Sequence, residues 1–239
     1  MEIRYLPLRP KAYCMYAIDH AATALLIKKR SPKSPLFVLL ISVQLAELFW
    51  VLFNFMGIEY FSVSNGRLHL DFLPYSHSIF SGVVLAGLFY IIVYGIYKRH
   101  DIALASSVGV ISHIVIDLVF HEHDIRLSPF SEQPAWGFGI INAPVADFVI
   151  ELSYGIFCWW YFKGSRALLI VIILFNVLDL PVMLASGDSL QPLARHHYLL
   201  PAFILFQILI TWYFVWRHAR VRPPRPPLPR SQTSWHQSS

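Results

Sequence analysis

Six long apolar stretches constrain the fold of this chain more than any other feature. Each runs for about 18 residues or more with at most one or two ionisable groups, and a helix of that length crosses a hydrocarbon layer of about 30 Å. The stretches are Leu36–Met56, His77–Tyr97, Ile102–Phe120, Pro144–Phe162, Ala167–Ala185 and Tyr198–Trp216. Only 14% of the 239 residues are charged, too few to cover a water-soluble surface of this size. The sequence therefore predicts an all-α, polytopic membrane helix bundle with about six transmembrane helices.

Lysine and arginine are distributed unevenly between the connections. The connections on one side of the predicted bundle hold thirteen of these residues. The connections on the other side hold only Arg67, Arg126 and Arg195. The thirteen are Lys28, Lys29, Arg30, Lys33, Lys98, Arg99, Lys163, Arg166, Arg217, Arg220, Arg222, Arg225 and Arg230. Basic residues near helix ends resist translocation, so the rich side is expected to be cytoplasmic, with the C-terminus there and the protein in the inner (plasma) membrane. The net charge of +5 then reflects topology, and no nucleic-acid partner is expected.

The two ends of the chain differ from its apolar body. Residues 1–216 are expected to form the membrane domain, and residues 217–239, rich in proline and arginine, a disordered cytoplasmic tail. Near the N-terminus, Ala12–Ile27 is short for a span and has basic residues on both sides, which favours a short re-entrant or interfacial helix. Cys14 and Cys158 both lie in apolar segments and predict neither a disulfide framework nor a metal clip.

Ionisable residues inside the predicted helices gather towards the side opposite the basic loops. Glu47 lies in the outer half of the first long helix, His77 opens the second, and Glu151 lies in the outer half of the fourth. His113 and Asp117 lie near the outer end of the third. Because such residues are costly in a bilayer, each one is a candidate for function.

The strongest local pattern is SHIVIDLVFHEHD, from Ser112 to Asp124. At about 100° per residue, His113, Asp117 and Asp124 fall within roughly 40° of one another around a helix. A histidine and an aspartate four residues apart project over the same turn, so they can converge on one divalent cation. The alternative is a buried pair that only fixes helix packing.

Several segments, taken in order along the chain, carry a family resemblance. They are DHAA at Asp19–Ala22, QLAELFWVLFNFMGIEY at Gln44–Tyr60, LDFLPYSHS at Leu70–Ser78, SHIVIDLVFHEHDIRL at Ser112–Leu127 and GFGIIN at Gly137–Asn142, with Glu151 following. Their order resembles that of the YdjM-like inner-membrane proteins, a family described as metal-dependent hydrolases. The chain departs from the family pattern at three positions, where Glu47 replaces aspartate, His123 replaces proline and Ile141 replaces tryptophan.

The resemblance implies a divalent metal centre, zinc in the first place. The implied ligands are His20, Glu47, His77, His113 and Asp117, together with His121. The expected activity is a membrane-embedded hydrolase acting on a lipid-linked or amphiphilic (phospho)ester, with Glu47 or Asp124 accepting a proton. Membrane lipids and an amphiphilic substrate are the expected partners. The alternatives are a non-enzymatic transporter or ion and proton relay, and a structural membrane protein whose polar cluster sets helix packing.

Overall fold

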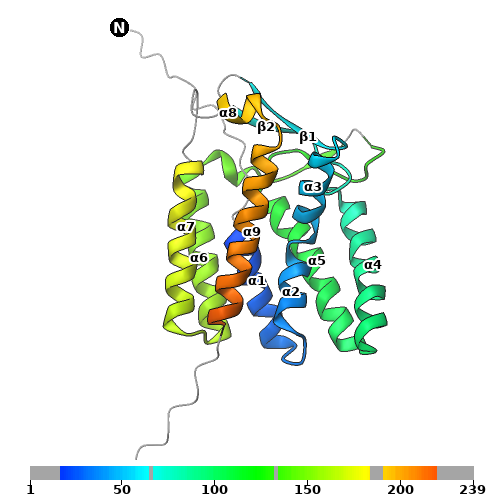
Figure 1. The fold of residues 1–239 in the computed structure, drawn as a ribbon, viewed down its shortest axis with the longest axis vertical. Helices are drawn as coiled ribbons and strands as arrows, with labels where there is room; N and C mark the ends of the chain where they lie inside the picture. The colour runs from blue at the N-terminus through cyan, green and yellow to red at the C-terminus, as the bar shows by residue number, and fades with distance from the viewer. Residues whose placement is uncertain (1–16, 65–66, 132–133, 184–190, 220–239) are drawn as a thin grey trace, which may run out of the picture.

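The computed structural model describes residues 17–64, 67–131, 134–183 and 191–219. This part is a bundle of helices lying side by side, with short strands and α8 gathered at one end (Figure 1). The helices are α1 Ala17–Arg30, α2 Leu36–Val43, α3 Leu45–Phe55, α4 Ile79–Tyr97, α5 His100–Phe120, α6 Pro144–Phe162, α7 Arg166–Met183, α8 Gln191–Arg195 and α9 Leu199–His218, with the 3₁₀ turn η1 Ile140–Asn142 before α6.

Two small antiparallel hairpins interrupt the helical pattern. Strand β1 (Tyr60–Ser64) pairs with β2 (Arg67–Phe72), and β3 (Ile125–Arg126) pairs with β4 (Ala135–Trp136). Both lie in long connections, where the backbone outside helices must find hydrogen-bond partners of its own. The all-α prediction therefore holds for the bundle and not for these two connections.

Three helices of the described part, α4, α5 and α9, are long and apolar enough to span a membrane. The bent pair of α2 and α3 makes a fourth candidate when it is counted as one span. All six predicted stretches fold mainly as helix, but α6 and α7 are not among the candidate spans of the described residues. The described helices thus indicate a membrane protein.

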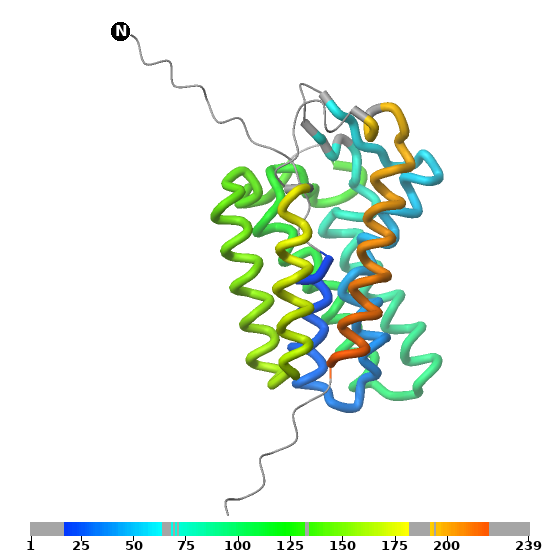
Figure 2. Tube along the Cα trace, turned by 60° about the vertical axis from the view of Figure 1, so that its left-hand side comes forward, coloured from blue at the N-terminus to red at the C-terminus, as the bar shows by residue number. Residues whose placement is uncertain are grey.

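The basic connections lie together at one end of the bundle. Figures 1 and 2 place the turns α1–α2, α4–α5 and α6–α7, and the end of α9, at the end opposite the hairpin β1–β2. The segregation that the lysines and arginines predict is therefore present in the fold.

The first long apolar stretch is broken, which corrects the prediction of one continuous helix over Leu36–Met56. Helices α2 and α3 meet at an angle of 56°. Gln44 lies at the break with φ −124° and ψ 17°, outside the α-helical region. Its side-chain amide donates to the Ala17 carbonyl at 3.0 Å, and its Oε1 accepts a hydrogen bond from the Trp212 indole. Bonds from two other helices to one side chain hold the bend in place.

Helix α1 lies inside the bundle, against α2, α5, α6, α7 and α9. Every residue from Ile18 to Leu25 is buried, and Ile18 and Leu25 belong to the main apolar core. Its alanines allow neighbouring helices to approach closely. An interfacial helix would expose one face to headgroups, so that alternative is wrong for Ala17–Ile27. Residues 12–16, Cys14 and most of the predicted tail lie outside the described residues.

Candidate metal centre

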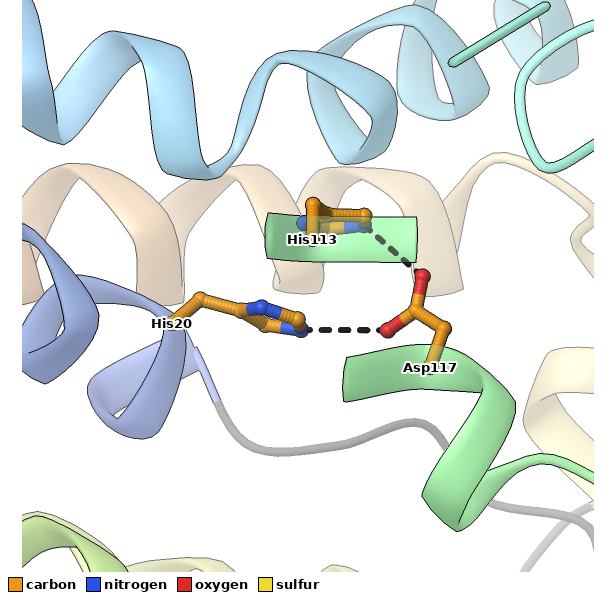
Figure 3. Close-up of side chains that lie close together, drawn as sticks. All are labelled: His20, His113 and Asp117. Atoms are coloured by element: carbon orange, nitrogen blue, oxygen red, sulfur yellow. Dashed lines mark ion pairs between the residues drawn. The ribbon is translucent and has the colours of Figure 1, made fainter. Parts of the chain in front are cut away.

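Five of the residues predicted as ligands converge from four separate parts of the fold. Helix α1 supplies His20, α3 supplies Glu47, the segment before α4 supplies His77, and α5 supplies His113 and Asp117. All five are buried, with exposed fractions between 0% and 8%. Figure 3 shows the His20 ring below that of His113, with Asp117 beside both rings. The convergence that the sequence predicts for His77, Glu47, His113 and Asp117 is present.

Five distances among four donor atoms are close to those that a tetrahedral metal ion requires. His77 Nε2 lies 3.4 Å from His113 Nε2, 3.2 Å from Glu47 Oε2 and 3.7 Å from Asp117 Oδ2. His113 Nε2 lies 3.8 Å from Glu47 Oε2 and 3.1 Å from Asp117 Oδ2. Zinc–ligand bonds of about 2.0–2.1 Å place tetrahedral ligands about 3.3 Å apart. The five distances scatter around that value.

The break at Gln44 fixes the protonation of His113. His113 Nδ1 lies 2.8 Å from the backbone carbonyl of Val43, the last residue of α2. A carbonyl oxygen can only accept, so Nδ1 carries the proton, and in the neutral ring Nε2 presents a lone pair. Nε2 lies 3.4 Å from His77 Nε2 and 3.1 Å from Asp117 Oδ2, a buried oxygen that accepts no hydrogen bond. Two acceptors facing each other at 3.1 Å need a cation or an added proton between them.

His77 is held from its other ring nitrogen by residues that the sequence analysis missed. Ser76 Oγ lies 2.7 Å from His77 Nδ1 and donates to Glu59 Oε2 at 2.6 Å. Glu59 is 1% exposed and also accepts the backbone N–H groups of Tyr75 and Ser76. Burial raises the pKa of Glu59, and the hydrogen bonds from Ser76 oppose this rise. In the sequence, the only indication of a role for Glu59 was that it lies in GIEY, the end of the segment Gln44–Tyr60 quoted for the family resemblance.

His20 occupies the edge of the cluster. Its ring stacks on His113 with centroids 4.1 Å apart, and its Nε2 lies 3.5 Å from Asp117 Oδ1. Its Nδ1 is buried and makes no hydrogen bond. His20, His113 and Asp117 form one group of mutually close donors, and Glu47, His77 and His113 form a second. His113 belongs to both groups, so the two groups adjoin at its ring.

His121 and Asp124 form a separate pair beside the cluster. His121 is buried, its ring stacks on His77 at 6.0 Å, and its Nδ1 lies 3.2 Å from Asp124 Oδ1. Neither residue belongs to the two donor groups found among the described residues. The structure therefore places His121 next to a candidate ligand, with Asp124 orienting its ring. Their predicted roles, ligand and proton acceptor, stay predictions.

Another set of buried acids lies where α1 packs against α6 and α7. Both carboxylate oxygens of Asp19 are buried without a hydrogen bond, and Oδ1 lies against Gly155 of α6. Glu151, also on α6, is 1% exposed, and Asp179 on α7 accepts a hydrogen bond from Gln207 at 2.5 Å. Asp179 thus has a partner on α9 that its sequence surroundings do not reveal.

Comparisons of the chain with protein-family models, with curated proteins and with solved structures found no match. The donor geometry therefore carries the functional argument.

Proposed function

We propose that this chain is a membrane-embedded, metal-dependent hydrolase that holds one divalent ion, zinc in the first place, on Glu47, His77, His113 and Asp117. The observation that carries the proposal is the set of buried nitrogen and oxygen donor atoms that lie 3.1–3.8 Å apart. Two imidazole nitrogens and two carboxylates meet there in a buried setting, and the Nδ1 proton of His113 is already committed to the Val43 carbonyl. Buried charges persist when they are paired or coordinate a metal.

The donor set suits zinc better than calcium or magnesium. Histidine nitrogens with carboxylate oxygens at tetrahedral spacing are typical of zinc, whereas calcium and magnesium prefer six or more oxygen ligands. If one of the two carboxylates stays free of the ion and leaves a coordination position open to water, a divalent ion held there would polarise a phosphoryl or acyl oxygen and activate that water near neutral pH. His121, oriented by Asp124, lies close enough to the cluster to accept a proton from that water.

Position suggests the class of substrate. The cluster lies among membrane-length helices, at the end of α5 near the hairpin β1–β2 (Figure 1). A lipid-linked or amphiphilic (phospho)ester reaches such a depth by placing its apolar part in the bilayer. We further propose six membrane crossings, with the basic end of the bundle in the cytoplasm and the centre towards the outer side of the inner membrane, on the basis of the lysine and arginine distribution.

The test uses purified full-length protein in detergent with fluorescent phospholipid substrates. We expect cleavage that a chelator abolishes, that added Zn²⁺ restores, and that His113→Ala lowers to background. The matched control is His100→Ala, because His100 stacks on Tyr94 at the opposite end of the bundle. Failure of every phosphodiester and carboxylester in the panel, with zinc bound, would contradict the hydrolase assignment.

One feature favours the ion or proton relay as a second candidate. The buried Asp19 directly precedes His20, so buried acids adjoin the metal centre along α1. Acids of this kind inside membrane helices mark ion and proton pathways. Zinc or proton flux in proteoliposomes, lost in Asp19→Asn while hydrolysis persists, would support that candidate. Unchanged flux in Asp19→Asn would remove it.

A further inference from the structure

We propose that Glu59 is a positioning residue of the metal centre, acting through the Ser76 hydroxyl to hold His77 in the tautomer that can bind a metal. Its importance for function rests on the proposed metal centre. The tautomer itself follows from hydrogen bonds that involve no metal.

The Glu59 carboxylate is surrounded by hydrogen-bond donors. Its Oε1 accepts from the N–H groups of Tyr75 at 2.8 Å and Ser76 at 2.9 Å, and its Oε2 accepts from the Ser76 hydroxyl at 2.6 Å. Three donors surround one carboxylate that is 1% exposed. A buried carboxylate with this many hydrogen bonds is satisfied as an anion.

The position of one proton follows from this arrangement. A serine hydroxyl has one proton to donate, and at 2.6 Å the charged Glu59 oxygen is the stronger acceptor. The contact of 2.7 Å between Ser76 Oγ and His77 Nδ1 must then be donated by the imidazole. Nδ1 therefore carries a proton. Nε2 lies 3.2 Å from Glu47 Oε2 and 3.4 Å from His113 Nε2, so in the metal-free ring it can share a second proton with Glu47, and a metal ion would take that proton's place.

Glu59 also connects the outer hairpin to the centre. It directly precedes β1, whereas Tyr75 and Ser76 follow β2, so its carboxylate joins the two ends of the hairpin that spans Tyr60–Phe72. Residues that orient metal-bound histidines through their second ring nitrogen commonly change metal affinity by about 10- to 100-fold when they are replaced. The same relation is expected for Glu59 and His77.

The decisive variant is Glu59→Gln. The glutamine oxygen must face the two backbone N–H groups, which turns its NH₂ group towards Ser76 Oγ. The serine proton is then released to His77 Nδ1, and Nδ1 loses its own proton. We expect ¹⁵N spectra of histidine-labelled, metal-free protein to show a proton on His77 Nδ1 in the wild type and none there in Glu59→Gln, with the His77 signals assigned from His77→Asn.

Zinc affinity gives an independent reading. We expect Glu59→Gln to weaken zinc binding by about 10- to 100-fold, and to have no further effect in a Ser76→Ala background. The matched control is Asp101→Asn, because Asp101 is an exposed carboxylate paired with Arg99 at the opposite end. It should change neither the His77 tautomer nor the zinc affinity.

The outcomes separate this inference from the proposed function. A wild-type His77 without a proton on Nδ1 overturns the Glu59 assignment, and this measurement needs no variant to fold. An equal loss of affinity from Glu59→Gln with and without Ser76 overturns it as well, because Glu59 would then act by another route. If the wild type binds no zinc, the metal centre fails while the tautomer measurement still decides the role of Glu59.

Discussion

Replacing Asp117 with asparagine separates a metal ligand from a packing partner. The two side chains have the same shape, but asparagine lacks the charge and gains an N–H donor. In the metal-free protein with a neutral His113, Asp117 Oδ2 and His113 Nε2 are two acceptors 3.1 Å apart. The asparagine amide can donate to that nitrogen. We therefore expect Asp117→Asn to stabilise the metal-free protein and to weaken metal binding.

The difference in melting temperature between Asp117→Asn and the wild type should change sign when zinc is added. One buried hydrogen bond contributes about 0.5–1.5 kcal/mol, which raises the melting temperature of metal-free Asp117→Asn by roughly 1–6 °C for a chain of 150–250 residues. Zinc at a concentration 100 times its Kd stabilises the wild type by about 2.7 kcal/mol, or roughly 5–11 °C. The order of the two melting temperatures should therefore reverse between chelator and zinc.

The assay is thermal unfolding of both proteins in the same detergent, with EDTA and with increasing zinc. A packing pair gives a different pattern, because a protonated His113 and an ionised Asp117 would lose their attraction in the variant with or without metal. Asp117→Asn melting below the wild type in EDTA, together with no effect of zinc on the wild type, would refute the reasoning.

Two further predictions concern packing and topology. Gly109→Ala should destabilise the protein by about 1–3 kcal/mol, because the new Cβ would lie 2.1 Å from Ser42 Oγ. The control Gly87→Ala on α4 has open space around the new Cβ and should stabilise the helix by about 0.5–1 kcal/mol. Equal free energies of unfolding for the two variants would contradict this account of the α2–α5 contact. In a version of the chain that lacks its two native cysteines, an impermeant maleimide applied to intact cells should label Ser131→Cys and spare Ser165→Cys. The reverse pattern would show that the proposed orientation is inverted.

The helices were predictable from the sequence because their signal is local. A long apolar stretch must satisfy its backbone within itself, so the bounds of α6 agree with the predicted stretch Pro144–Phe162. The break at Gln44 was not predictable, since it depends on a backbone carbonyl from α1 and an indole from α9. The central place of α1 likewise depends on contacts with helices far along the chain.

Some residues of the candidate site were predictable from the sequence, and others were not. The pair His113 and Asp117 follows from helical spacing, and costly ionisable residues at matching depth pointed to His77 and Glu47. The Val43 carbonyl is a metal-site partner only because the helix breaks there. Glu59 was missed because it follows a helix in an ordinary loop, and its partner Ser76 is identified only when the hairpin closes.

The central claim is that this cluster holds a metal ion, and elemental analysis of the purified protein tests it most directly. Protein purified without chelator should contain about one zinc ion per chain, as a single tetrahedral site requires. His113→Ala should contain almost none, while His100→Ala should match the wild type. Wild-type protein free of zinc and of other divalent transition metals, and unable to take up Zn²⁺ on dialysis, would contradict the account.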